Sequence, residues 1–218
     1  MVNEPVLILG SKGNMGKRYK ACLDYMSIKS IGVDREDQIP RNLRRAIICT
    51  PSNMHTVSAD QLIELGYKDL LIEKPIFNKE CDFEWGLKNE HLARMQMVNN
   101  YRYLDGYSGE TIYDYYHAGN EEPWENLFQL IGMAKETFYY SNKSPIWICV
   151  LNGRKLTLED VQRSYVEMLA HWVKGHEIRS ISDAYEWYKK AKLWQLKWQS
   201  DSKQESAQND SQIRSFMS

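Results

Sequence analysis

The chain has 218 residues, of which 43% are hydrophobic, and a formal net charge of -1. A chain of this length can bury a real core, and its near-neutral charge without a long basic run argues against a nucleic-acid partner. No apolar run approaches the roughly 18 residues of a membrane span, and no secretory leader is evident. The four cysteines have neither metal nor redox spacing. We therefore expect a reduced, cytoplasmic protein with no metal site and no membrane partner.

The first predicted element is a buried strand at residues 5–9, which runs directly into a glycine-rich turn and then a helix from about Met15 to Tyr25. In this context the glycines admit a dinucleotide pyrophosphate and the helix N-terminus offers free amides to phosphate. Gly13 would let the backbone approach the pyrophosphate, and Gly16 would let the helix pack closely. An ordinary glycine-rich turn is the alternative. The cofactor-binding residues predicted here are Gly10, Ser11, Gly13, Asn14, Met15 and Gly16.

A second strand, at residues 30–34, ends in Asp34. An acidic residue at this distance past the glycines usually accepts the ribose hydroxyls, although a turn-forming aspartate is the alternative. Arg35 follows directly and could stack on adenine or pair with a 2′-phosphate, so both NAD and NADP stay open. Residues 36–45 are too few and too proline-broken for a full crossover helix, which predicts a trimmed nucleotide-binding domain.

A strand–helix–strand unit follows. Its first strand, at residues 46–49, breaks at a turn in which Ser52 and Asn53 are suitable helix N-caps. The next helix stops at Gly66 and is expected to pack through Val57, Leu62, Ile63 and Leu65. A second apolar run then ends in the sequence EKP. Because ligands bind at the carboxyl ends of parallel strands, Lys74 lies where chemistry is usually done.

The sequence CTPSNMH, followed after one helix by EKP, resembles the Gfo/Idh/MocA family of NAD(P)-dependent sugar oxidoreductases. The resemblance implies that Lys74 lies between nicotinamide and substrate and helps to move the proton of the reacting hydroxyl. It also implies cofactor contacts from Thr50, Pro51, His55, Glu73 and Lys74. A structural role for His55, or a merely solvated Lys74, is the alternative.

After EKP we expect a helix over residues 79–92, with Phe83, Leu87 and His91 on one face, and a strand over residues 95–98. The run NNYRY that follows is similar to one that opens onto the substrate cleft in the family, which implies substrate contacts from Arg102 and Tyr103. Arg102 would bind a carboxylate or phosphate of the substrate. Alternatively, it pairs with an acidic residue and holds two domains together.

The second half of the chain predicts a smaller set of elements. Strands are expected at residues 111–116, 137–140 and 146–151, the last followed by an Asn152-Gly153 turn. Helices are expected at 123–134, at 158–174 before Gly175, and from a Ser182-Asp183 cap to 198. The last two helices resemble the closing scaffold helices of the family, the final one packing back on the nucleotide-binding domain. His171 and Trp172 are therefore expected in the core.

One departure from the family pattern concerns the proton relay. Many family members carry a histidine on a helix facing the nicotinamide, as acid–base partner of the lysine. The corresponding stretch here, EEPWEN, has none. Glu125, which shares a helix face with Glu122, or His117 would take that role in a closed cleft. Alternatively, Glu122 and Glu125 only favour a helix N-terminus.

Together these observations predict an α/β fold, with a Rossmann-like doubly wound parallel sheet over residues 1–103 and a smaller α+β domain over 104–198. Residues 199–218 are polar and aperiodic, and we expect them to be disordered. The resemblance implies NAD or NADP as cofactor and hydride transfer with a free or nucleotide-linked sugar. The alternative is a cofactor-binding protein of the same fold that acts through a partner. An open face of the small sheet predicts a homodimer.

Overall fold

A computed structural model describes residues 4–105, 113–116, 139–141, 148–151, 154–190 and 192–193. Its main sheet has five strands in the order β2-β1-β3-β4-β5, and every pairing is parallel. The strands are β1 (Val6–Leu9), β2 (Ser30–Val33), β3 (Arg45–Ile48), β4 (Asp69–Ile72) and β5 (Arg94–Met97). The predicted Rossmann-like parallel sheet is therefore confirmed.

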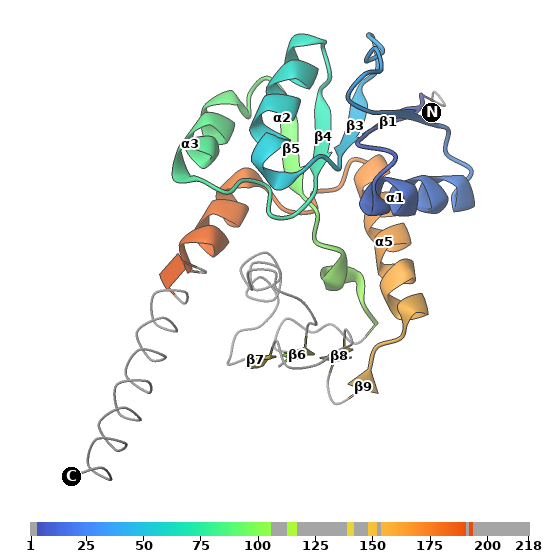
Figure 1. Cartoon of the computed structure of the whole chain (residues 1–218), viewed down its shortest axis with the longest axis vertical. Coiled ribbons are helices and arrows are strands. Elements are labelled where there is room, and N and C mark those ends of the chain that lie inside the picture. The colour runs from blue at the N-terminus through green and yellow to red at the C-terminus, as the bar shows by residue number, and fades with distance from the viewer. Residues whose placement is uncertain are drawn as a thin grey trace, which may run out of the picture.

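Helices cover both faces of this sheet (Figure 1). One face carries α1 (Asn14–Tyr25) and α5 (Leu158–Val173), and the other carries α2 (His55–Glu64), α3 (Glu80–Asn89) and a helix over residues 181–190. Because successive side chains of a strand point to opposite faces, Ile8 packs with α1 and α5 whereas Leu7 packs with the other layer. Strands buried on both faces explain the continuous apolar runs in the sequence.

The long helix α5 belongs to the core of this sheet. It begins with a capping box, in which the Thr157 hydroxyl accepts from the Asp160 amide at 3.1 Å and the Asp160 carboxylate accepts from the Thr157 amide at 2.8 Å. It ends at Val173, and Gly175, the predicted stop, follows two residues later with a left-handed φ of +89°. Trp172 is fully buried as expected, but the expectation for His171 is wrong because its side chain faces solvent.

Two expectations for α2 are wrong. Ser52 and Asn53 form a 3₁₀ turn, Ser52–Met54, and the residue before α2 supplies no side-chain cap. Val57 is 59% exposed, because the helix starts at His55 and turns Ala59 and Leu62 toward the sheet. Partly buried Ile63 and Leu65 pack beside them.

Two helix ends further along the chain also differ from the predictions. Helix α3 stops at Asn89, so His91 lies beyond it and is exposed rather than on its packing face. The helix over residues 181–190 begins after Ser180, whose hydroxyl accepts from the Asp183 amide at 3.2 Å. The cap is therefore Ser180 and not the predicted Ser182-Asp183 pair.

A second sheet has the strand order β7-β6-β8-β9. Strands β6 (Tyr113–Tyr116) and β7 (Tyr139–Ser141) are parallel, whereas β8 (Ile148–Leu151) is antiparallel to both β6 and β9 (Arg154–Lys155). The three strands predicted in this half are confirmed, and β9 was not predicted. The expected 123–134 helix, the Asn152-Gly153 turn, His117, Glu125 and the tail lie outside the described residues. Across the part of the chain that is described, no helix is long and apolar enough to cross a membrane.

Candidate functional site

The carboxyl ends of the parallel strands meet at the edge of the sheet where the strand order reverses, between β1 and β3. Here the Cys49 amide donates to the carbonyl of Leu9 at 2.8 Å, and the Gly10 amide donates to the carbonyl of Val33 at 2.8 Å. The turns after β1, β2 and β3 therefore begin side by side. Ligands of open α/β sheets bind at such a switch point.

The glycine turn is closely packed at Gly10 and Gly16. Gly10 has a φ of +87°, and a Cβ there would lie 2.7 Å from the Cys49 carbonyl oxygen. A Cβ on Gly16 would lie 2.3 Å from the Gly10 oxygen, so α1 rests directly on the turn. By contrast, a Cβ on Gly13 would meet only the Gly10 oxygen at 3.4 Å, an ordinary contact. Packing within the protein does not require Gly13, and the expected approach of a pyrophosphate there stays a prediction.

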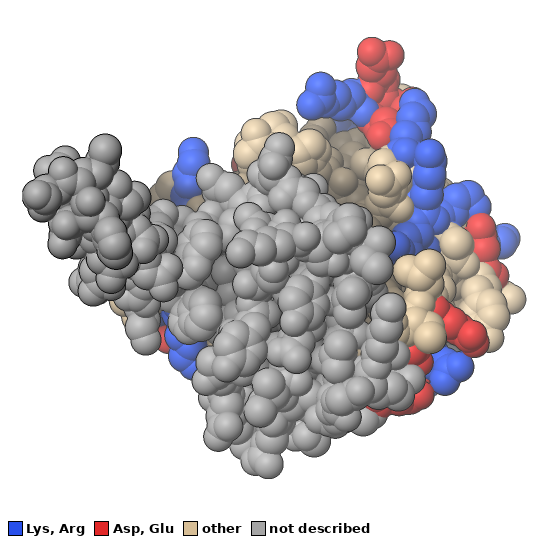
Figure 2. Space-filling view, turned by 60° about the horizontal axis from the view of Figure 1, so that its bottom comes forward, with Lys and Arg blue, Asp and Glu red and all other residues tan. Residues whose placement is uncertain are grey.

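The first turn of α1 suits an anion. Its N-cap is Gly13, which has no side chain to bond the free amides, and no acidic residue lies in the turn. Unpaired amides and the positive end of the helix dipole favour a phosphate at this position. Figure 2 shows Lys and Arg side chains in a band at the right of the described surface. The turn therefore fits the pyrophosphate of a dinucleotide.

Asp34 follows β2 and is bonded to the glycine turn. Its Oδ2 accepts from the Ser11 hydroxyl at 2.7 Å and from the Lys12 amide at 3.1 Å. Gly32 makes room for this contact, since a Cβ there would lie 2.8 Å from the Ser11 side chain. Among the hydrogen bonds that the described residues make, none reaches Oδ1 of Asp34. The second oxygen thus stays available to accept from a ligand hydroxyl.

The surroundings of Asp34 and Arg35 bear on whether Asp34 binds a ribose or only forms a turn. Asp37 fills the turn role, because its carboxylate accepts from the Asp34 amide at 2.9 Å. Arg35 is exposed. The contacts of Asp34 therefore favour the ribose interpretation over the turn-forming alternative.

Lys74 is the first residue after Glu73 at the carboxyl end of β4, and the Lys74–Pro75 peptide bond is cis. Its amide donates to Oε2 of Glu73 at 3.0 Å, and Oε1 of Glu73 accepts from the Tyr19 hydroxyl at 2.5 Å. Glu73 is only 6% exposed. The carboxylate therefore points into the layer beneath the sheet edge, which favours a supporting role. A cofactor contact from Glu73 stays a prediction.

The interior around Glu73 is buried and affects the neighbouring titratable groups. Burial, followed by the charge of Glu73, raises the pKa of the Tyr19 phenol well above its usual value. The same two causes, in the same order, raise the pKa of the Cys49 thiol. Tyr19 therefore stays protonated across the physiological range and can only donate to the carboxylate. Cys49 stays an unreactive thiol.

His55 braces the two turns that flank the site. It is 1% exposed, and its Nδ1 lies 2.9 Å from the Pro75 oxygen and 3.1 Å from the Ile76 oxygen, while Nε2 lies 2.9 Å from the Thr50 oxygen. Carbonyl oxygens only accept, so a ring nitrogen forms a hydrogen bond in these contacts where it carries a proton to donate. These contacts favour the structural alternative for His55. Thr50 is partly buried and Pro51 is exposed, and their predicted cofactor contacts stay predictions.

Arg102 and Tyr103 follow β5 in a short 3₁₀ helix, Asn100–Tyr103. Nη1 of Arg102 donates to the Ile178 carbonyl at 3.0 Å, and the Tyr103 ring lies 5.1 Å from the His171 ring. Arg102 thus ties this segment to the chain after α5, through a carbonyl rather than an acidic side chain. Their predicted substrate contacts stay predictions. In the described ranges, no cluster of His, Cys, Asp or Glu could hold a metal.

Sequence reasoning missed Tyr19, which lies one helical turn after Gly16. Its position in an apolar helix pattern signals only a core residue. The hydrogen bond that it makes spans 54 positions of the chain, and no local pattern predicts such a pair.

The sequence matches no protein-family model, and no curated protein aligns with it significantly. Solved structures do resemble it at about one-tenth identity. The WlbA dehydrogenase from Thermus thermophilus, solved with NAD and UDP-GlcNAcA, has a TM-score of 0.64 at 10% identity, over 88% of this chain and 94% of that chain. UDP-N-acetylglucosamine 3-dehydrogenase GnnA from Acidithiobacillus ferrooxidans has a TM-score of 0.64 at 10% identity, over 88% and 97%.

A third similar structure has a different ligand. Biliverdin reductase from Synechocystis sp. PCC 6803, solved with biliverdin and NADP+, has a TM-score of 0.61 at 9% identity, over 88% of this chain and 98% of that chain. Likeness at such low identity establishes the shared Rossmann-like fold. The differing ligands show that this fold does not by itself determine the substrate.

Proposed function

We propose that the chain is an NAD(P)-dependent oxidoreductase of the Gfo/Idh/MocA type that transfers a hydride between nicotinamide and a carbon of a sugar or sugar-like substrate. One observation carries the proposal: an uncapped helix N-terminus on a glycine turn, Asp34 and Lys74 all lie at one carboxyl edge of a parallel sheet. Solved structures of similar fold that contain NAD or NADP support it.

The residues of the turn fit each part of the cofactor. The amides of Asn14 and Met15 would hold the pyrophosphate, and Oδ1 of Asp34 would accept from the adenosine ribose. The bound nicotinamide would supply or accept the hydride. Lys74 would bind the oxygen of the reacting carbon and hold or release its proton. Such a residue acts on the substrate without any metal.

We further propose a preference for NAD over NADP. The Asp34 carboxylate is held in place by Ser11 and the Lys12 amide, so it cannot turn away from a 2′-phosphate. Two negative groups in contact repel each other, whereas a ribose hydroxyl would donate to the same oxygen. The exposed Arg35 side chain opposes this preference but is free to point into solvent.

Cofactor binding can be measured by energy transfer from tryptophan to reduced nicotinamide during titration of the purified protein. We expect saturable binding of NADH and at least about tenfold weaker binding of NADPH. Asp34→Ala should weaken NADH by about tenfold, the usual effect of one lost hydrogen bond to a charged group. Asp60→Ala, on the exposed side of α2, is the matched control. Absence of binding of either nucleotide at millimolar concentration would refute the proposal.

The substrate class is proposed from the resemblance around Lys74, from a neighbour solved with UDP-GlcNAcA and from another named UDP-N-acetylglucosamine 3-dehydrogenase. Free and nucleotide-linked sugars are both candidates. Arg102 and Tyr103 are proposed substrate contacts. Glu125 or His117 is the proposed proton relay.

A second candidate is a cofactor-binding protein of the same fold that performs no turnover and acts through a partner. The sequence EEPWEN, which lacks the histidine of many family members, favours it. The intact lysine of EKP favours the enzyme. The two candidates predict the same cofactor affinity, and they differ in whether Lys74 supports turnover.

We also propose a homodimer formed through the small sheet, with β6 and β8 at its interface. A sheet face without covering helices is usually an interface, and two-fold pairing is its commonest form. Light scattering at micromolar concentration is expected to give twice the mass of one chain. A mass equal to one chain across the concentration series would contradict this proposal.

A further inference from the structure

The Glu73 carboxylate joins α1 to the residue after β4. Oε1 accepts from the Tyr19 hydroxyl at 2.5 Å, and Oε2 accepts from the Lys74 amide at 3.0 Å. Each oxygen of the Glu73 side chain thus accepts from a different partner. We call this pair of hydrogen bonds the Tyr19–Glu73–Lys74 clasp.

The surroundings of the clasp fix the position of Tyr19. Its ring is fully buried and meets the ring of Tyr165 from α5 edge to face, with centroids 5.7 Å apart. The Arg18 guanidinium carbon lies 5.2 Å from the centroid of the Tyr165 ring. Cys49 approaches from the turn after β3. The titratable and charged groups around Glu73 are therefore Tyr19, Arg18, Tyr165, Cys49 and Lys74.

Helix α1 also sets the glycine turn. Gly16 allows the helix to lie directly on the Gly10 carbonyl, and Tyr19 lies one helical turn further along the same rigid element. The first turn of α1 would hold the cofactor phosphates, while Tyr19 holds the end of β4. One helix thus determines how far the phosphates lie from Lys74.

We propose that Tyr19 is a positioning residue, which acts through the Glu73 carboxylate to hold Lys74 in register with the glycine turn. Phenylalanine would fill the same space but could not donate, so the hydroxyl is the functional part. The catalytic consequence rests on the proposed function, whereas the clasp itself does not. The two can therefore be tested apart.

The clasp is tested without substrate by following the backbone amide of Lys74 by NMR. In Tyr19→Phe the Glu73 carboxylate loses the hydroxyl that holds Oε1, so the hydrogen bond from the Lys74 amide to Oε2 should loosen. We expect the chemical shift of this amide to move and its exchange with solvent to become about tenfold faster in Tyr19→Phe.

Two further variants make this result specific. Tyr67→Phe removes a hydroxyl that donates to the Pro40 carbonyl at 2.9 Å, away from the clasp, and should leave the Lys74 amide unchanged. Glu73→Gln replaces the carboxylate by a neutral amide and should change the Lys74 amide as well, so it provides a second test of the clasp if Tyr19→Phe does not fold. An unchanged Lys74 amide in folded Tyr19→Phe or in Glu73→Gln would overturn the proposal.

The catalytic consequence is read from turnover. A displacement of about 1 Å at a reacting group lowers rates by about 100-fold, so kcat of Tyr19→Phe should fall by about 10- to 100-fold while KM for the cofactor holds. Wild-type kcat in Tyr19→Phe, on a substrate whose turnover needs Lys74, would overturn the positioning role. A changed Lys74 amide in Tyr19→Phe with no Lys74-dependent turnover on any substrate would instead refute the proposed function and support the clasp.

Discussion

Replacing Lys74 by methionine is expected to lower turnover by about 10²- to 10⁴-fold, the usual contribution of a positioned proton-transferring group. The ammonium would act on the reacting oxygen chiefly in the transition state, so its loss should reduce kcat and leave the affinity for NADH nearly intact. Methionine keeps most of the volume of the lysine stem. The backbone amide of Lys74, which Glu73 holds, is unaffected by the change.

Turnover is to be measured by nicotinamide absorbance, with free and UDP-linked sugars and with NAD or NADP. Lys68→Met is the matched control, because Lys68 precedes β4 at the opposite edge of the sheet and its side-chain ammonium donates to the Leu92 carbonyl at 3.2 Å. It should turn over like the wild type. A Lys74→Met variant with near-original turnover would show that the catalytic assignment is wrong. Cofactor-dependent binding of a partner without any sugar turnover would favour the non-enzymatic alternative.

The sheet could be predicted from the sequence because its strands are buried on both faces. Val6 and Leu7 point to opposite layers yet are both fully buried, so the apolar run is continuous and easily seen. Helix phase was harder to predict, because it depends on the residue at which the helix begins. A 3₁₀ turn shifted the start of α2 to His55 and left Val57 in solvent.

The candidate site likewise contains residues that could be predicted from the sequence and contacts that could not. The glycine turn and Asp34 could be predicted because each directly follows a strand, and parallel strands bring their carboxyl ends to one edge. The support for Lys74 could not, because Tyr19 lies 54 positions before Glu73. Such contacts depend on which helix covers which strand, and local residue patterns do not predict that arrangement.

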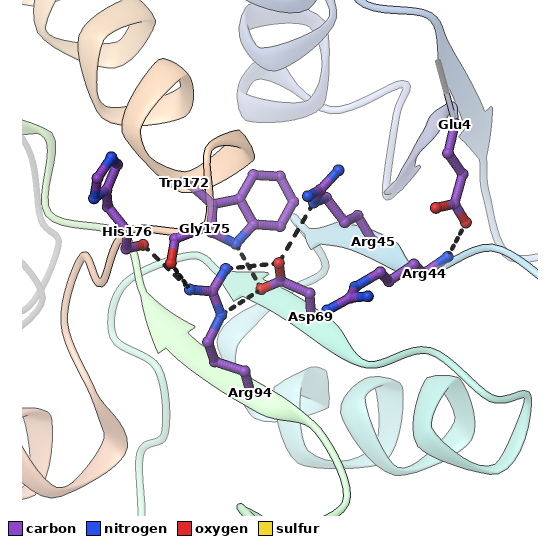
Figure 3. Close-up of polar contacts among 8 residues, drawn as sticks. All are labelled: Glu4, Arg44, Arg45, Asp69, Arg94, Trp172, Gly175 and His176. Atoms are coloured by element: carbon purple, nitrogen blue, oxygen red, sulfur yellow. Dashed lines mark hydrogen bonds and ion pairs between the residues drawn. The ribbon is translucent and has the colours of Figure 1, made fainter. Parts of the chain in front are cut away.

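Asp69, at the opposite end of the sheet, is a second long-range contact that no local pattern indicates (Figure 3). It is 3% exposed, and it accepts from Nε and Nη2 of Arg94 at 3.0 and 2.7 Å and from the indole of Trp172 at 2.9 Å. Arg45 forms an ion pair with it at 3.5 Å. Arg94 also donates to the Gly175 carbonyl at 2.6 Å. One carboxylate therefore joins β3, β4 and β5 to the end of α5.

We expect Asp69→Asn to lower the free energy of unfolding by about 3–5 kcal/mol, the usual effect of removing one partner of a buried ion pair. The arginines would keep their charges without a counter-charge, and the amide nitrogen of asparagine would turn a donor toward other donors. Urea unfolding followed by tryptophan fluorescence measures the loss. The matched control is Asp24→Asn, which breaks the 2.7 Å ion pair between Asp24 and Lys20. Both side chains are exposed, Lys20 to 59% and Asp24 to 56%. Such surface pairs contribute about 0–1 kcal/mol, so equal losses in the two variants would show that the Asp69 network does not hold α5 to the sheet.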